Sequence, residues 1–262
     1  MVAPQPTDLT ILVLSEDSAK DCHPTLKALL LHMLKLVDPA SRPGRVAIEP
    51  VDDLHKPVVS ANLWRSTNQK DRQRIVELVR YIGTTLATGK FVVFHADGDH
   101  VWSERKSAGI EGQFAKLIAE KVERVLREQA KPVMDGRMTA SDGIKNLVLI
   151  VPFYSVEAWL YQNTKAAIAL CHKHYRGKDA GQFAKWENNR GALDEVAKVK
   201  ESVCLGAKHN AELAEDPFPA KAVYDVKKSF EAAVGRLTQC APLVTALAKT
   251  RRGAGDSATT QT

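Results

Sequence analysis

The chain is poor in cysteine and in long apolar segments, and both shortages exclude classes of protein. Its 262 residues include four scattered cysteines, Cys22, Cys171, Cys204 and Cys240, without a Cys-x-x-Cys pair. This spacing predicts neither a disulfide framework nor a zinc knuckle. No segment approaches the ~20 consecutive apolar residues of a membrane-spanning helix. The opening residues, MVAPQPTD, lack the basic start and apolar centre of a signal peptide. We therefore expect a cytoplasmic protein that does not contact membranes.

Low-complexity sequence is also absent, apart from the last residues. The stretch Arg251–Thr262, which ends in GAGDSATTQT, has too few apolar residues to pack and is predicted to be disordered. The remaining composition, 44% apolar and 26% charged, is that of an ordinary globular protein. The net charge of +6 is a modest basic surplus, which permits a polyanionic partner such as nucleic acid without requiring one.

What the chain does contain is an alternation of apolar strands and amphipathic helices. The predicted strands are Leu9–Leu14, Arg45–Val51, Phe91–His95 and Asn146–Pro152. The predicted helices between them are Pro24–Val37, Lys70–Leu86 and Ser107–Gln129. This alternation predicts an α/β fold, with a mainly parallel sheet and helices on both faces.

After Pro152 the pattern changes, because no strong strand follows. Helices are predicted at Val156–Asn163, Lys165–His174, Ala192–Val203, Lys208–Ala214, Pro219–Leu237 and Pro242–Lys249, with loop and turn over Gly177–Gly191. We therefore divide the chain into an α/β core (residues 1–160), a helical appendage (residues 161–250) and a disordered tail (residues 251–262).

The most informative stretch follows the third predicted strand. Asp97 and Asp99 come directly after Phe91–His95, and Gly98 between them allows a sharp turn. Open α/β sheets bind ligands at the carboxyl ends of their strands. Two carboxylates there can hold a hard cation such as Mg²⁺, which prefers oxygen ligands. The alternative is a plain polar turn, since Asp-Gly is a common turn dipeptide.

Two further acids follow strands that should end at the same edge. Glu16 comes just after Leu9–Leu14, and Glu157 follows the fourth strand in the first turn of a predicted helix. In a parallel sheet these carboxylates would approach Asp97 and Asp99. Glu157 also has a structural explanation, because the helix dipole favours an acid in the first turn.

These residues resemble a known family. A Glu after the first strand, an Asp-x-Asp after the third and a doubly wound sheet are similar to a toprim domain, as found in topoisomerases, primases and overcoming-lysogenization-defect (OLD) nucleases. The sequence Glu157-Ala158-Trp159-Leu160 and the helical C-terminal part resemble a toprim-related group of uncharacterised bacterial proteins, often linked to phage defence. The resemblance covers Leu9–Leu160, with a weaker similarity up to Lys249.

The resemblance implies a metal-dependent nuclease that hydrolyses DNA or RNA with Mg²⁺ or Mn²⁺, and it suggests a phage-defence complex with a partner protein as the setting. Asp97 and Asp99 would bind the metal, Glu16 would bind metal or act as general acid/base, and Glu157 is a further candidate ligand. The cations Lys20, Arg105 and Lys106 are candidates for binding the substrate phosphates.

The first motif departs from the family pattern, which leaves other functions open. Family members commonly have Gly after the Glu and an acid three residues further, whereas this chain has Asp17 and Lys20. This change favours an alternative, a catalytically inactive toprim-like binding or regulatory subunit of a larger complex. A third reading, a phosphotransferase with Asp97 as nucleophile, lacks the expected continuation after Asp99.

Overall fold

The computed structural model describes residues 7–15, 22–59, 63–130, 140–197, 207–215 and 217–251. Its centre is one four-stranded sheet in which all strands run parallel, in the order β2-β1-β3-β4. The strands are β1 (Leu9–Ser15), β2 (Val46–Glu49), β3 (Phe91–His95) and β4 (Leu147–Ile150). The predicted α/β fold with a parallel sheet is confirmed, and it is Rossmann-like with added C-terminal helices.

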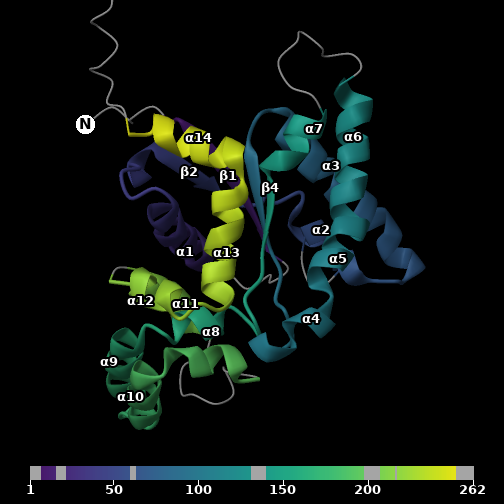
Figure 1. Ribbon diagram of the computed structural model, residues 1–262. Coiled ribbons are helices and arrows are strands. Elements are labelled where there is room, and N and C mark those ends of the chain that lie inside the picture. Colours follow the sequence, from purple (N-terminus) through teal and green to yellow (C-terminus); the bar gives the residue numbers. More distant parts are fainter. Residues whose placement is uncertain are drawn as a thin grey trace, which may run out of the picture.

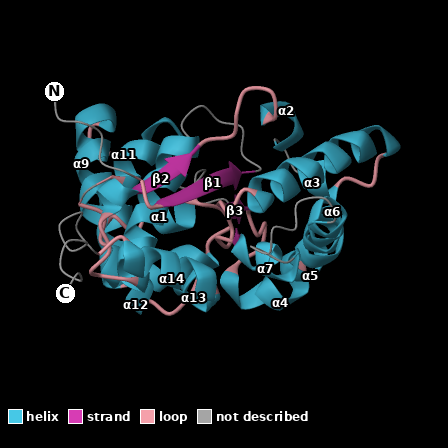
Figure 2. Ribbon diagram, turned by 90° about the horizontal axis from the view of Figure 1, so that it is seen from above, coloured by secondary structure: helices cyan, strands magenta, loops and turns pink. Residues whose placement is uncertain are grey.

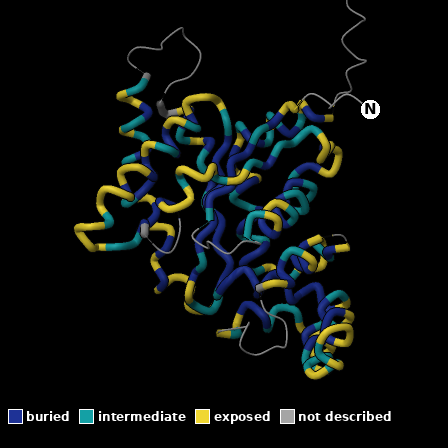
Figure 3. The backbone as a smooth tube through the Cα atoms, turned by 180° about the vertical axis from the view of Figure 1, so that it is seen from behind, coloured by how far each residue is buried: buried dark blue, intermediate teal, exposed yellow. Residues whose placement is uncertain are grey.

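Both faces of the sheet are buried. Successive residues of a strand point to opposite sides, so Ile11 and Val13 of β1 join one apolar cluster while Leu12 and Leu14 join another. Every residue of β3 is buried. Figure 3 shows buried backbone segments gathered in the middle of the molecule. Continuous apolar strands are what a parallel sheet covered on both faces requires.

One layer of helices covers the face that carries Leu12 and Leu14 (Figure 1). It consists of α3 (Arg72–Ala87), α5 (Ile110–Phe114) and α6 (Glu120–Ala130), with the short α2 (Lys56–Val59) beside them. The rings of Trp64, Phe94 and Phe114 meet inside this layer, with centroids 5.1, 5.8 and 6.0 Å apart. Aromatic contacts of this kind add to the stability gained from burying the rings.

The helix predicted over Ser107–Gln129 is interrupted twice. Gly109 has a φ of +61°, a left-handed conformation that glycine adopts without strain, and it follows the short α4 (Arg105–Ala108). A π-helical turn at Ala115–Ala119 then separates α5 from α6. The glycine is a visible signal for the first interruption, whereas the π-helical turn has no comparable signal.

The other face of the sheet is covered by α1 (Cys22–Val37) and by α13 (Ser229–Gln239) from the C-terminal third of the chain. Three further helices, α11 (Asn210–Ala214), α12 (Ala220–Asp225) and α14 (Ala241–Lys249), pack against these two. Leu9 of β1 belongs to the same apolar cluster as Leu237 and Leu247. The expected appendage therefore packs on the sheet and shares its core. Figure 2 shows the two groups of helices on either side of the strands.

The remaining described α-helices are α7 (Ala140–Gly143), α8 (Glu157–Leu160), α9 (Thr164–Tyr175) and α10 (Ala180–Asn188). The prediction of loop and turn over Gly177–Gly191 is wrong, because α10 occupies most of it. Phe183 and Trp186 lie three residues apart on α10, and both are buried with their rings in contact. Burial of this pair explains why the segment is helical despite its glycines.

Two other helix predictions are wrong in part. A 3₁₀-helix at Arg190–Glu195 occurs where the sequence predicts an α-helix over Ala192–Val203, whose last residues lie outside the described ones. The helix predicted over Pro219–Leu237 divides into α12 and α13 near Lys227, which has a φ of +63°. Lysine seldom adopts this left-handed conformation, so the local sequence does not predict the break.

The cysteines and the chain end differ in part from expectation. Cys171 is disulfide-bonded, which the cysteine spacing does not predict, whereas Cys22 and Cys240 are not in disulfides and Cys204 lies outside the described residues. Arg251, the first residue of the predicted tail, donates hydrogen bonds of 2.8 and 3.0 Å to the carboxylate of Asp38. Residues 252–262 lie outside the described part. None of the described helices is both long enough and apolar enough to span a bilayer.

A buried polar network joins α8 to α13. The indole nitrogen of Trp159 donates to Ser229 Oγ at 2.6 Å, and Ser229 in turn donates to the carboxylate of Asp194. Gln162 Nε2 donates to the other oxygen of Asp194 at 3.2 Å. Burial raises the pKa of Asp194 to about 6, against the opposing effects of the Ser229 hydrogen bond and Lys228.

This raised pKa predicts a pH-dependent stability. The folded state favours the protonated form of Asp194. The contribution of this carboxyl to the unfolding free energy is therefore complete below pH 3.8 and is lost as pH rises through about 6. Relative to Asp194→Asn, the wild type should lose about 2 kcal/mol of unfolding free energy between pH 4 and pH 7. Urea denaturation of both proteins across this range measures the difference. If the unfolding free energies of the two proteins change with pH by the same amount, the raised pKa of Asp194 is contradicted.

Candidate active site at the carboxyl edge of the sheet

The carboxyl ends of β1, β3 and β4 meet at one edge of the sheet. Ser15 is paired with His95, and His95 with Ile150, so the three strands end at the same level. The connection from β1 leads to β2 on one side, and β3 lies on the other side of β1. The boundary between β1 and β3 is therefore the switch point at which sheets of this kind bind ligands.

The loop after β3 is fixed by backbone hydrogen bonds to the segment after β4. The amide of Gly98 donates to the carbonyl of Pro152 at 2.9 Å, and the amide of Asp99 donates to Tyr154 at 3.1 Å. A Cβ atom on Gly98 would lie 2.9 Å from the ring of Phe153 and 3.0 Å from the Pro152 oxygen, so only glycine fits. Asp99 has a φ of +53°, which Asp tolerates better than most residues.

Asp97 lies beside a buried histidine. The Nε2 atom of His95 is 3.5 Å from Oδ1 of Asp97 and makes no hydrogen bond within the described residues, although His95 is only 1% exposed. Its Nδ1 atom is 3.0 Å from the hydroxyl of Ser15. Burial lowers the pKa of His95 to about 4, with the charge of Glu157 acting in the opposite direction. The imidazole is therefore neutral at physiological pH, and Ser15 and Asp97 flank its two nitrogens.

Asp99 forms an ion pair with Arg65. Nη1 of Arg65 donates to Oδ2 of Asp99 at 2.9 Å, and Nη2 donates to the backbone oxygen of Asp97 at 2.7 Å. The guanidinium also lies 4.9 Å from the ring centroid of the buried Trp64. Arg65 thus holds both aspartates of the loop in place. The sequence does not single out Arg65, because residues 52–68 show no periodic apolar pattern.

Glu157 lies in the first turn of α8 and is 5% exposed. Its Oε2 atom accepts a hydrogen bond of 2.6 Å from Ser155, and its Oε1 atom accepts one of 3.1 Å from Asn210. Burial raises the pKa of Tyr161, and the charge of Glu157 adds to this effect. Both oxygens of Glu157 are therefore engaged by protein donors, and Asn210 is a second residue that sequence analysis missed.

The other candidate residues fall into two groups. Glu16 and Lys20 lie outside the described residues. Arg105 and Lys106 are on α4, where they line a pocket with Phe153, and no described contact joins them to Asp97 or Asp99. Within the described ranges, no three or more His, Cys, Asp or Glu side chains are grouped to hold a metal ion. A site with three acids would therefore depend on Glu16, the residue that follows Ser15.

Comparison of the chain with family models, with curated proteins and with solved structures found no match.

Proposed function

We propose that this chain is a metal-dependent nuclease that hydrolyses phosphodiester bonds of DNA or RNA. The observation that supports it best is the position of Asp97 and Asp99 at the switch point of an all-parallel sheet, next to the end of β1. Their side chains are 28% and 55% exposed, so a cation and a phosphate can reach both. The resemblance to toprim domains adds Glu16 to this pair and phage defence as a setting.

The donor set fits Mg²⁺ or Mn²⁺. Asp97 and Asp99 offer the carboxylate oxygens that such cations prefer. The buried Nε2 of His95, which faces Asp97 without a hydrogen bond, suits a neighbour that orients a metal-binding carboxylate. Glu157 is the poorest candidate ligand, since Ser155 and Asn210 occupy both of its oxygens. We assign Glu157 to the support of this edge instead of to the cation.

The chain's own residues would have separate tasks. Asp97 and Asp99 would hold the cation, which when bound polarises the phosphate and lowers the pKa of water. Glu16 would transfer a proton as general acid/base or complete the ligand set. Ser15 would fix the ring of His95, and His95 would orient Asp97. Arg65 would keep the loop in one conformation through its two hydrogen bonds.

The ion pair between Arg65 and Asp99 supports a second candidate function. A guanidinium there supplies part of the positive charge that a metal would otherwise provide. With the altered Glu16-Asp17 motif, this pair favours an inactive toprim-like subunit that binds or regulates a larger complex. In that case the edge would be stable without any cation.

Thermal melting in the presence of metal separates the two functions. A ligand that binds only the folded state and is present at 100 times its Kd adds about 2.7 kcal/mol to the unfolding free energy. For a chain of this length, millimolar Mg²⁺ or Mn²⁺ should then raise the Tm by roughly 5–10 °C over the value in chelator. Asp97→Asn should abolish the increase with the fold intact. The control Asp225→Asn, an exposed acid paired with Lys221, should keep it. An unchanged wild-type Tm in both ions would favour the inactive subunit.

A further inference from the structure

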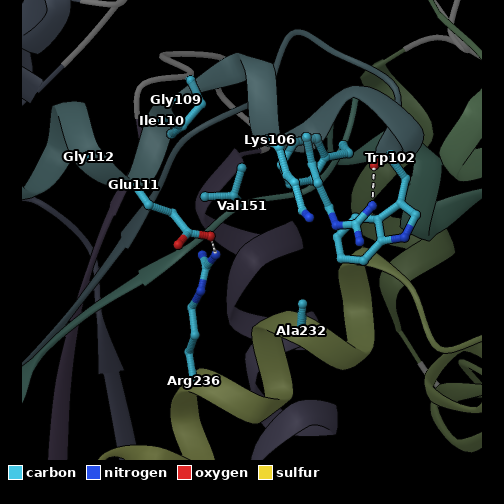
Figure 4. A pocket seen from close by; sticks show the side chains of 11 residues that line it. Trp102, Lys106, Gly109, Ile110, Glu111, Gly112, Val151, Ala232 and Arg236 are labelled. Atoms are coloured by element: carbon cyan, nitrogen blue, oxygen red, sulfur yellow. Dashed lines mark hydrogen bonds and ion pairs between the residues drawn. The ribbon is translucent and has the colours of Figure 1, made fainter.

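A pocket of about 340 Å³ lies next to the aspartate loop, between α4, α5 and α13. In Figure 4, Trp102 and Lys106 line one side, and the ion pair between Glu111 and Arg236 lines the other. Val151 lies between the two sides and supplies an apolar surface. The pocket thus combines an aromatic wall, an apolar surface and several cations.

The aromatic wall is preorganised. The guanidinium of Arg105 lies 4.1 Å from the ring centroid of Trp102 and donates a 2.9 Å hydrogen bond to its backbone oxygen. The indole also meets the ring of Phe153 at 5.4 Å, edge to face. Trp102 is partly exposed, whereas the other three tryptophans of the chain are at most 5% exposed. Stacked aromatic and guanidinium planes of this kind bind unpaired bases.

The pocket also carries uncompensated positive charge. Arg236 is paired with Glu111, but neither Arg105 nor Lys106 forms an ion pair with any described residue. Both of these side chains are exposed. Two such cations beside an aromatic surface match a nucleotide, which joins a flat base to a phosphate.

Phe153 connects this pocket to the aspartate loop. Its ring lines the pocket, and it also packs against Gly98, the residue between Asp97 and Asp99. Trp102, whose ring meets that of Phe153, is therefore separated from the aspartate loop by one side chain. The pocket is therefore close enough to the aspartates to bind part of the substrate of the proposed nuclease.

We infer that the pocket is a subsite for an unpaired nucleotide, with its base against the Arg105–Trp102 stack and its phosphate at Lys106. The substrate class is therefore single-stranded nucleic acid, an assignment that rests on the proposed nuclease function for its link to cleavage. A base within a duplex is already stacked and paired, so it cannot enter without being extruded.

The test is binding in chelator, where metal-dependent cleavage cannot occur. The probes are oligothymidylate and oligouridylate of about 12 nucleotides, within the usual range of such sites, and a duplex of equal length. The single strands should bind at least about tenfold more tightly than the duplex and quench the emission of Trp102. Trp102→Phe should remove the quench. Equal affinity for single strand and duplex, or no binding of either single strand, would overturn the inference.

Charge variants complete the test. Arg105→Ala with Lys106→Ala should weaken single-strand binding at least about tenfold. The log–log slope of affinity against salt should fall by about 0.7 for each phosphate that the variant no longer binds. The matched control, Arg80→Ala with Lys185→Ala, removes two exposed cations elsewhere and should bind as wild type. Unchanged affinity of the pocket variant would overturn the subsite. Single-strand binding that depends on the pocket, without cleavage in Mn²⁺, would support the subsite and leave the choice between nuclease and inactive subunit to the metal melting experiment.

Discussion

Asp97→Asn should lower metal-dependent cleavage by about 10²- to 10⁴-fold, the range expected when a positioned acidic group is lost from a reaction centre. The substitution keeps the shape of the side chain and removes its charge. Asp97 lies at the end of β3 and faces the buried Nε2 atom of His95. Loss of this carboxylate removes the proposed metal ligand, whereas the backbone hydrogen bonds of Gly98 and Asp99 remain.

The measurement is a paired assay on single- and double-stranded DNA and RNA, with Mn²⁺ and with chelator. Glu16→Gln should give a loss of similar size, while Asp225→Asn should cleave as wild type. Binding should survive in both active-site variants and weaken with salt, because it depends on phosphate contacts. Cleavage that persists in chelator, or that is equal in Asp97→Asn, would reject the mechanism. If no protein cleaves, the metal melting experiment decides between nuclease and inactive subunit.

Trp159→Ala should cost about 3–5 kcal/mol of unfolding free energy, as deletion of a buried tryptophan typically does. Trp159 is fully buried on α8, and its ring meets Phe230 edge to face at 5.4 Å. Its indole nitrogen also donates to Ser229 on α13. The variant loses both the packing and the hydrogen bond, and it leaves a cavity between the site edge and the C-terminal helices.

Urea denaturation monitored by circular dichroism measures this loss of unfolding free energy. Trp159→Phe keeps an aromatic ring but removes the donor to Ser229, so it should cost about 1–3 kcal/mol. Trp102→Phe changes a partly exposed ring and should stay within about 0.5 kcal/mol of wild type. If Trp159→Ala lost less unfolding free energy than Trp159→Phe, Trp159 would not hold α8 against α13.

The strands of this protein are predictable because their signal is local. Leu9–Leu14 and Phe91–His95 are apolar except for Thr10 and His95, and a parallel sheet buried on both faces selects such runs. The position of Asp97 and Asp99 beyond β3 follows directly from that assignment. The ends of helices are harder to predict. Lys227, for example, adopts a left-handed conformation that its neighbours in sequence do not suggest.

The partners of the site residues are not predictable from local sequence. Arg65 reaches Asp99 from 34 positions away, and Asn210 reaches Glu157 from 53 positions away. Neither residue belongs to a motif, and each lies near its acid only because the chain folds back on itself. The pairing of Ser15 with His95 depends on strand register, which is fixed once β1 and β3 are aligned.

The shared core of the first and last elements has a consequence for synthesis on the ribosome. Leu9 and Leu30 emerge early, yet the apolar cluster they join also contains Leu237 and Leu247. The nascent chain therefore exposes an apolar surface of α1 and the sheet until nearly all of it has been translated. We expect a chain released after residue 160 to aggregate or to require a chaperone, and folding to become cooperative only when α13 and α14 have left the exit tunnel.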